Sequence, residues 1–277
     1  MLRRPSTLRY PARSRRRANE QARTAPWSWA MAGALLGLML ALLLNAPARW
    51  LAAMVQQSLE GRVLLSDARG TVWNGTARLT LTGGAGSLDA ATLPGRLSWR
   101  LRPSWTGLAA QLNADCCMQQ AWQLSLRPRW GGASLALADS QSQWPAQWLT
   151  GLGTPWNTVQ PEGQLSLSTH GLVAEWAAGR FVLQGGAQLD ALHLSSRLST
   201  LKPMGSYRLV LQSGAAPSLS LSTVEGALQL SGTGQWVGGR LRFEGVASAA
   251  PERLDALSNL LNIIGRRDGA RAIIKVG

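Results

Sequence analysis

The sequence is poor in the side chains on which catalysis depends. Its 277 residues include two histidines, two cysteines, two tyrosines and 14 acids. These numbers argue against a metal cluster, and the chain has no G-x-S-x-G elbow, Walker A loop or G-x-G-x-x-G fingerprint. We expect His170 and His193 to be structural or solvated. The sequence therefore predicts no catalytic residue, no metal ligand and no bound cofactor, and an enzyme is the least favoured class.

Lysine is scarce too, with two residues against 26 arginines, and the net charge is +14. Residues 1–26 hold eight arginines and a single acid, Glu20, so half of the net charge lies in a short N-terminal segment. This segment has one aromatic residue, Tyr10, and no nucleic-acid-binding motif. We therefore expect a basic tail that sets membrane topology and contacts anionic headgroups, and no nucleic-acid partner.

An uncharged apolar run, residues 27–46, follows the basic tail. A helix of about 20 apolar residues spans a bilayer core of about 30 Å. A cleaved signal peptide is the alternative, but its apolar region would be shorter, and Asn45–Arg49 is a poor cleavage site. We expect an uncleaved transmembrane helix. Its anchoring side chains are predicted to be Trp27, Trp29, Leu35, Leu36, Leu40 and Leu44.

The arginines before this helix predict its orientation. Basic residues stay on the cytoplasmic side of a membrane, so residues 1–26 should form a cytoplasmic tail. Residues 47–277 should then lie across the membrane, which in a bacterium is the periplasm. The expected localisation is a single-pass bacterial inner-membrane protein in contact with the phospholipid bilayer.

The exported part is dominated by strict alternation of apolar and polar residues, which is typical of half-buried strands. The clearest segments are Leu97–Arg102, Trp122–Arg127, Leu165–Ser168, Leu219–Ser222, Leu228–Ser231 and Leu241–Glu244. Turns are predicted at Asn74-Gly75, Gly83-Gly84, Gly131-Gly132, Pro161–Gly163, Gly185-Gly186, Glu225-Gly226 and Gly238-Gly239. The predicted fold class is mainly β: an antiparallel sheet-rich domain with short flanking helices, after one transmembrane helix.

Helical patterns flank and interrupt the strands. The first is expected near Ala48–Glu60, where Leu51, Val55 and Leu59 share one face. A second begins at Pro251 and ends before Gly265, and Ala272–Val276 should return as a last strand. Residues 140–160 break the strand rhythm with a short helix and loop, and an internal boundary could lie there.

Tryptophan is the abundant aromatic residue, with 13 copies against two phenylalanines. Trp73, Trp99, Trp122 and Trp236 occupy strand positions and should build the core. Trp144, Trp148 and Trp156 lie near prolines, and two interpretations remain open for them: core packing or a partner surface.

The adjacent Cys116 and Cys117 leave three alternatives: a vicinal disulfide, a bond to another chain, or two free thiols. None of the three gives the pair a catalytic role.

Several sequence segments, taken in order after one N-terminal anchor, resemble type II secretion system protein N (the GspN family). They are Gly70–Gly75, Leu93–Trp99, Gly205–Leu209, Glu225–Trp236, Arg242–Pro251 and Leu257–Gly269, and the resemblance covers about Ala46 to Gly277. The long basic tail and the cysteine pair are not part of the family pattern.

The resemblance implies a non-enzymatic accessory or scaffold subunit of the machinery that exports folded proteins across the outer membrane. Its partners would be other type II secretion system subunits, in the inner-membrane platform or the secretin. The family is also distantly similar to AsmA-like envelope proteins, which hold lipid in an apolar β-groove. A long curved sheet with an open apolar face would favour this alternative.

Overall fold

The computed structural model describes residues 27–277 except 178–179, 215 and 238–239. The basic tail and the turn predicted at Gly238-Gly239 lie outside the described residues. The chain divides into a unit that ends at Leu43 and a unit from Leu44 to Gly277, and each is described by itself.

The N-terminal unit is built around one helix, α1 (Trp27–Leu44), which continues one residue into the second unit. Its 18 residues carry no charge, and it is long and apolar enough to cross a membrane. At 1.5 Å per residue it is about 27 Å long. It ends two residues before the predicted limit at Ala46, because Pro47 disfavours the helical conformation in the residue before it.

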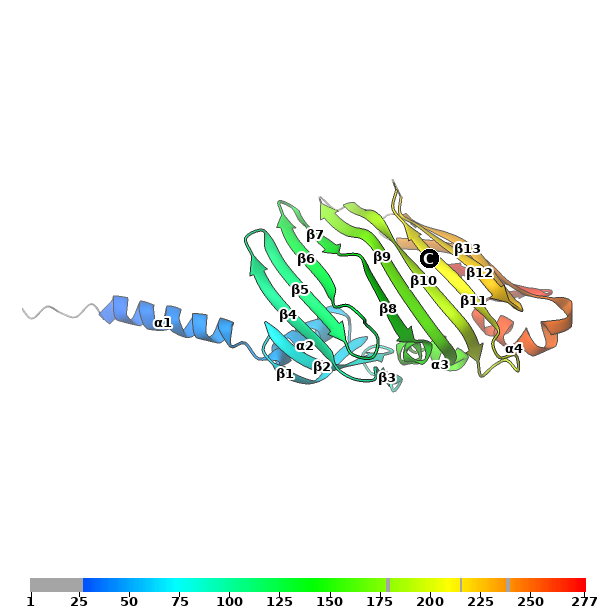
Figure 1. Cartoon of the computed structure of the whole chain (residues 1–277), viewed down its shortest axis with the longest axis horizontal. Coiled ribbons are helices and arrows are strands. Elements are labelled where there is room, and N and C mark those ends of the chain that lie inside the picture. The colour runs from blue at the N-terminus through cyan, green and yellow to red at the C-terminus, as the bar shows by residue number, and fades with distance from the viewer. Residues whose placement is uncertain (1–26, 178–179, 215, 238–239) are drawn as a thin grey trace, which may run out of the picture. The chain divides into compact units, whose positions relative to one another are not determined.

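The second unit is one 16-stranded antiparallel sheet (Figure 1). The strand order is β1-β2-β4-β5-β6-β7-β9-β10-β11-β12-β13-β14-β16-β15, with β3 paired to β2 and β8 paired to β9. The strands are β1 (Val63–Gly70), β2 (Asn74–Thr82), β3 (Ala90–Thr92), β4 (Leu97–Ser104), β5 (Gly107–Ala114), β6 (Trp122–Arg129), β7 (Gly132–Leu137), β8 (Ser140–Pro145), β9 (Pro161–Ala177), β10 (Arg180–Ser196), β11 (Gly205–Gln212), β12 (Ser218–Gly226), β13 (Leu228–Val237), β14 (Arg240–Ala249), β15 (Arg266–Asp268) and β16 (Arg271–Val276). The predicted fold class is confirmed, and all six alternating segments lie in strands.

Five short helical segments accompany the sheet: α2 (Ala48–Ser58), η1 (Ala146–Leu152), α3 (Trp156–Val159), η2 (Pro251–Arg253) and α4 (Leu254–Ile264). The predicted helices after Pro47 and after Pro251 are confirmed, as is the last strand. The break predicted at residues 140–160 contains the expected helical turns, η1 and α3, but it is wrong for Ser140–Pro145, which pair with β9 as strand β8. Figure 1 shows α2, α3 and α4 near one end of the long strands, which we call the helix end, and the hairpin turns of β4–β5 and β6–β7 at the other end.

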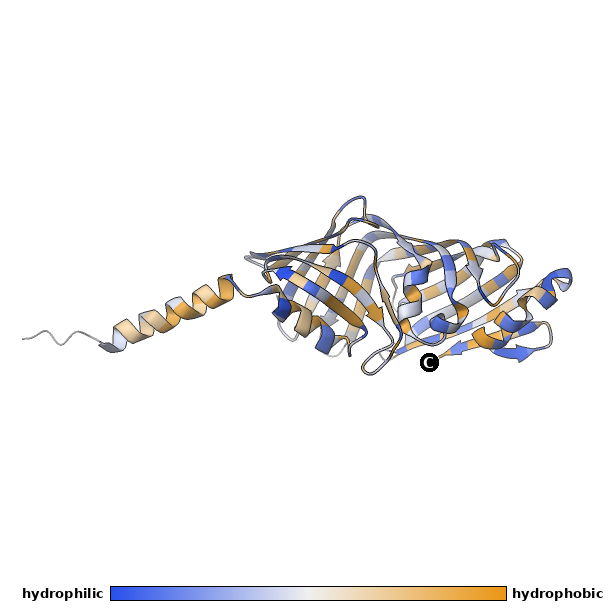
Figure 2. Ribbon diagram, turned by 90° about the horizontal axis from the view of Figure 1, so that it is seen from below, coloured by the Kyte–Doolittle hydropathy of each residue, from blue (hydrophilic) through white to orange (hydrophobic). Residues whose placement is uncertain are grey.

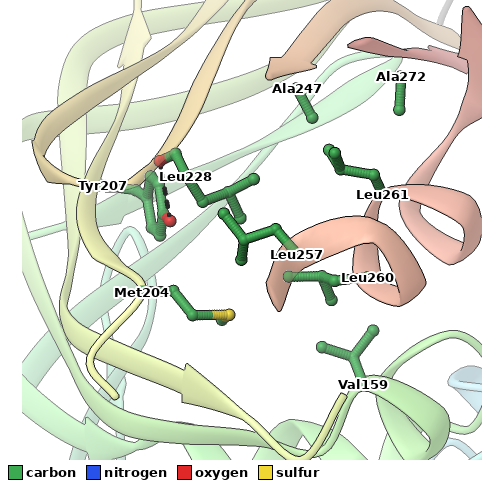
Figure 3. Close-up of a cluster of buried hydrophobic side chains, with 9 residues drawn as sticks. All are labelled: Val159, Met204, Tyr207, Leu228, Ala247, Leu257, Leu260, Leu261 and Ala272. Atoms are coloured by element: carbon green, nitrogen blue, oxygen red, sulfur yellow. Dashed lines mark hydrogen bonds between the residues drawn. The ribbon is translucent and has the colours of Figure 1, made fainter. Parts of the chain in front are cut away.

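Three hydrophobic clusters form the core. One joins α2 to the first strands through Ala48, Ala77 and Trp99. A second surrounds Trp144 near η1. The largest gathers around α4 (Figure 3), whose Leu257, Leu260 and Leu261 are fully or almost fully buried.

The sheet curves around α4. Tyr207 on β11 and Ala272 on β16 belong to the α4 cluster, although three strands separate β11 from β16 in the sheet. A flat sheet with a strand spacing of about 4.8 Å would hold these strands about 19 Å apart. Tyr207 also donates a hydrogen bond from its Oη to the carbonyl oxygen of Leu228 (3.1 Å), which satisfies a buried hydroxyl.

Four predicted turns are wrong because their residues lie inside strands. Glu225-Gly226 forms the end of β12 and pairs with β11. Gly185-Gly186 forms a β-bulge in the 17-residue strand β10, with Gly185 at φ 74°. Pro161–Gly163 begins β9, where proline is tolerated at the first strand position. Asn74-Gly75 begins β2, where Gly75 pairs with Trp99 of β4. A side chain at position 75 would collide with the indole ring of Trp99, so this position requires glycine.

Leu257 of α4 should be a major contributor to stability. Leu257→Ala empties a fully buried position and should lower the free energy of unfolding by about 2–5 kcal/mol. Ile263→Ala on the same helix should cost much less, because Ile263 is 39% exposed. Chemical denaturation of the full chain in detergent, followed by circular dichroism, measures both. Equal losses would contradict the assignment of the buried face.

Candidate binding surface

The strand register places the apolar residues of neighbouring strands on the same face of the sheet. In the first half, Gly75 pairs with Trp99, Trp99 with Leu112, and Leu112 with Trp122. Paired residues point to the same side, and alternate residues along each strand do so too. The apolar set of each strand therefore continues into the next one.

The same face continues without a break across the second half. Leu167 pairs with Leu189, Leu189 with Leu209, and Leu209 with Leu221. At the β9–β10 and β10–β11 pairings, an inserted residue would turn the following side chains to the opposite face. A β-bulge at each insertion keeps the apolar side chains on the same face of the sheet. We call this surface the apolar face, and Figure 2 shows hydrophobic and hydrophilic residues alternating along the strands.

The opposite face is polar and carries cross-strand ion pairs. Arg208 donates to Asp190 across β10 and β11 (2.7 Å), and Lys275 pairs with Glu244 across β14 and β16 (2.9 Å). Partial burial raises the pKa of Asp190, but the hydrogen bonds from Arg208 and Gln188 outweigh it and hold the pKa below its usual value. These contacts suit a solvated sheet surface, where each pair contributes modestly.

The apolar face is covered unevenly. Near the helix end its residues join the three clusters, as with Trp99, Leu165 and Leu228. Towards the hairpin turns, Leu126 is 40% exposed and Trp176 is 46% exposed. Further residues of this part are half-buried and belong to none of the three clusters: Leu124, Leu135, Leu172, Leu211 and Leu219. The structure thus leaves a partly open apolar surface.

The three tryptophans predicted as a possible partner surface have different environments. Trp144 is buried, packs edge-on against Trp122 (5.8 Å between ring centroids) and stacks on Trp148 (5.4 Å). Its indole nitrogen donates to the hydroxyl of Ser142 (2.9 Å). Trp156 begins α3 and is 39% exposed. The structure therefore brings Trp144 and Trp148 together, and of the three Trp156 is the most accessible to a partner.

Cys116 and Cys117 form a vicinal disulfide, the first of the three alternatives for this pair. Cys117 is buried in the cluster around Trp144, and its carbonyl oxygen accepts a hydrogen bond from the backbone N–H of Gln143 (2.8 Å). The pair lies in the turn between β5 and β6 and holds this connection against β8.

The two histidines lie at bulges of the long strands. His170 lines a small polar hollow with Asp139 and Thr169. Asp139 accepts a hydrogen bond from the N–H of Gly171 (2.7 Å), and Thr169 shares one with Ser140 (2.9 Å). These bonds fasten the β7–β8 connection to β9. Among the described residues, no group of histidine, cysteine and acidic side chains could hold a metal ion.

Sequence reasoning missed two tryptophans at the ends of hairpins. Trp105 lies in the β4–β5 turn and Trp130 in the β6–β7 turn, and both side chains are fully exposed. The exposed position of Trp130 could have been predicted, because Trp130 directly precedes the predicted turn Gly131-Gly132.

These features define a class of protein: an antiparallel β-sheet protein that has, in the part of the chain that the structure describes, one apolar helix long enough to span a membrane. The profile of type II secretion system protein N matches residues 61–274, and the chain belongs to this family. It is therefore a component of the type II secretion machinery. The protein N family is not a known enzyme family. Searches of the curated proteins and of the solved structures found no match.

The tryptophan cluster offers a matched pair of substitutions. In the described part of the chain, the buried indole N–H of Trp148 has no hydrogen-bond partner, whereas that of Trp144 is bonded to Ser142. Trp144→Phe should therefore lower the free energy of unfolding by about 1 kcal/mol more than Trp148→Phe. Chemical denaturation of both variants measures the difference, and a larger loss for Trp148→Phe would contradict it.

Proposed function

We propose that this chain is an accessory or scaffold subunit of the type II secretion system, anchored in the bacterial inner membrane, which aids assembly or stability of the machinery. The observation that carries the proposal is the family match over residues 61–274. The sheet offers a large surface for binding. Membership of the family implies that the partners are other subunits of the secretion system, and we propose the inner-membrane platform, the secretin, or both.

The anchor supports the inner-membrane location. The side chains of α1 are exposed along its whole length, including Trp27, Trp29, Leu35, Leu36, Leu40 and Leu44. Insertion into a bilayer lowers the free energy of an exposed apolar helix of this length. The arginines of residues 1–26 favour a cytoplasmic N-terminus, so the sheet from residue 47 onward would lie in the periplasm. The helix would also raise the local concentration of the sheet near membrane-bound partners.

The partner surface that we propose includes Trp156 on α3, together with Trp148 on the contacting segment η1 and Trp144, on which Trp148 stacks. Exposed tryptophan is a common anchor of protein interfaces. Addition of a partner strand to β1 is less favoured, because this edge strand has a bulge at Asp67. Arg96 donates to the carboxylate of Asp67 (2.7 Å) there, and hydrogen bonds from Arg96 and Arg69 lower the pKa of this carboxyl group. Such bulged and charged edges oppose strand pairing.

In-cell crosslinking tests the partner surface. A photo-crosslinking amino acid at Trp156 should capture another subunit of the secretion system. The same amino acid at Val246, which is exposed on the polar face of β14, should not. Mass spectrometry of the crosslinked bands identifies the partner. Crosslinks at neither position, or only at Val246, would contradict the placement of the surface.

Deletion of the gene tests the role itself. Secretion of folded substrates and the amount of assembled secretin complex should both fall and return with the wild-type chain. If neither changes, the scaffold proposal loses its support.

A second candidate function is favoured by the open part of the apolar face: the chain would hold the acyl chains of a lipid, as in AsmA-like proteins. Half-buried leucines such as Leu135 and Leu211, together with the more exposed Leu126, line a curved sheet whose other face is polar. Acyl chains would remove this surface from water. The two functions are compatible, since lipid would occupy the apolar face and the partner the α3 side.

Substitutions that place carboxylates on one face or the other distinguish lipid bound on the apolar face from lipid carried over non-specifically. Leu126→Asp with Leu211→Asp places two carboxylates on the apolar face and should remove most of the phospholipid that survives detergent washing. Ser125→Asp with Gln212→Asp places the same charges on the polar face of the same strands and should leave it in place. Phosphate analysis per chain measures both, after circular dichroism has shown that the sheet is intact. Equal lipid content in the two variants would argue against the candidate, because both retain α1.

A further inference from the structure

Figure 1 shows the β4–β5 and β6–β7 turns at the end of the sheet opposite the helices. Three tryptophans lie in these two turns and near the end of β9. Trp105 and Trp130 are fully exposed at the β4–β5 and β6–β7 turns, and Trp176 is 46% exposed near the end of β9. The strand order places β5 beside β6 and β7 beside β9, so the three hairpin ends follow one another along the sheet. We call these ends the hairpin rim: residues 100–108, 126–133 and 175–177.

The hairpin rim is basic. It contains Arg100, Arg102, Arg127 and Arg129, and its one acid, Glu175, pairs with Arg129 (3.5 Å). The net charge of these residues is +3. At the helix end, by contrast, acids and bases alternate, as in Glu252, Arg253 and Asp255 at the start of α4. Two fully exposed tryptophans and an excess of positive charge therefore coincide at the hairpin rim.

This combination matches the chemistry of a bilayer surface. Tryptophan is enriched where acyl chains meet headgroups, because its ring is amphipathic. Arginine beside it is attracted to anionic headgroups. Two fully exposed indoles on separate turns can enter a soft interface side by side, whereas an anchor in a protein interface is surrounded by contacts that exclude water. We propose that the hairpin rim docks onto the surface of an anionic phospholipid bilayer by inserting Trp105 and Trp130.

The position of the rim relative to the apolar face gives this docking a consequence. Trp176 and Phe181 pair across β9 and β10 with ring centroids 5.4 Å apart, at the end of the apolar face that meets the rim. A docked rim would bring the open part of this face next to the acyl-chain region of the bilayer. The docking itself rests on the rim alone and depends on neither proposed function.

Vesicle co-sedimentation tests the proposal with the full chain. The chain is held in a lipid-free scaffold of amphipathic peptide that shields α1, and sucrose-loaded vesicles of phosphatidylglycerol and phosphatidylethanolamine are added. Trp105→Ser with Trp130→Ser should lower the partition coefficient by about tenfold or more, because two large amphipathic rings no longer enter the interface. The sedimented fraction is compared at early times, before α1 transfers into the vesicles, because a chain inserted through α1 would sediment whatever its rim carries.

Two further variants complete the test. Arg102→Gln with Arg127→Gln should weaken binding to these vesicles by on the order of twentyfold and leave binding to phosphatidylcholine vesicles almost unchanged. Leu88→Ser removes a fully exposed apolar side chain at the helix end and should change nothing. Equal sedimentation of the wild type and the double tryptophan variant would overturn the proposal. So would a loss confined to the arginine variant, since electrostatic attraction without insertion would then suffice.

Discussion

The one-sided apolar pattern of an open sheet is the constraint on which the rest of this structure depends. A closed barrel would bury such a face by itself, but this sheet ends at the separate edges β1 and β15. Its apolar face must therefore be shielded by other means. Helices α2 and α4 and the segment from η1 to α3 shield the helix end, and each contributes apolar side chains to a cluster. The curvature around α4 provides further burial.

Small residues allow this curvature. Gly232 on β13 pairs with Gly245 on β14, and a side chain at either position would meet the ring of Phe243. The phenylalanine lies over the glycines and fills the space that side chains would occupy, which is the usual reason for glycine within strands. Ala247 and Ala272 continue this small surface beneath Leu261 (Figure 3), so that α4 can approach the strands closely.

Local pattern was sufficient to predict the strands β4, β6, β9, β12, β13, β14 and β16 and the helices α1, α2 and α4, because alternation and helical spacing are properties of neighbouring residues. The helical pattern between Pro251 and Gly265 predicted α4, and α4 lies where this pattern indicated. The errors have another physical origin. Gly185-Gly186 and Asn74-Gly75 have turn chemistry, yet pairing with adjacent strands holds them in bulged or extended conformations. The tertiary structure decides in such cases, and a single sequence does not contain the pairing partner.

The candidate surfaces divide in the same way between predictable and unpredictable. The anchor and the prominence of Trp144, Trp148 and Trp156 could be read from composition. Which of the three is exposed depended on non-local packing, because Trp144 contacts Trp122 of β6 and lies in one cluster with Leu165 of β9. The same applies to Trp105 and Trp130, 25 residues apart in sequence and brought to one rim by the strand order β4-β5-β6-β7. In a chain with so few catalytic side chains, function depends on how topology gathers tryptophan and arginine on surfaces. The positive charge that remains outside the N-terminal tail then has two physical roles: cross-strand pairing on the polar face and attraction of anions at the hairpin rim.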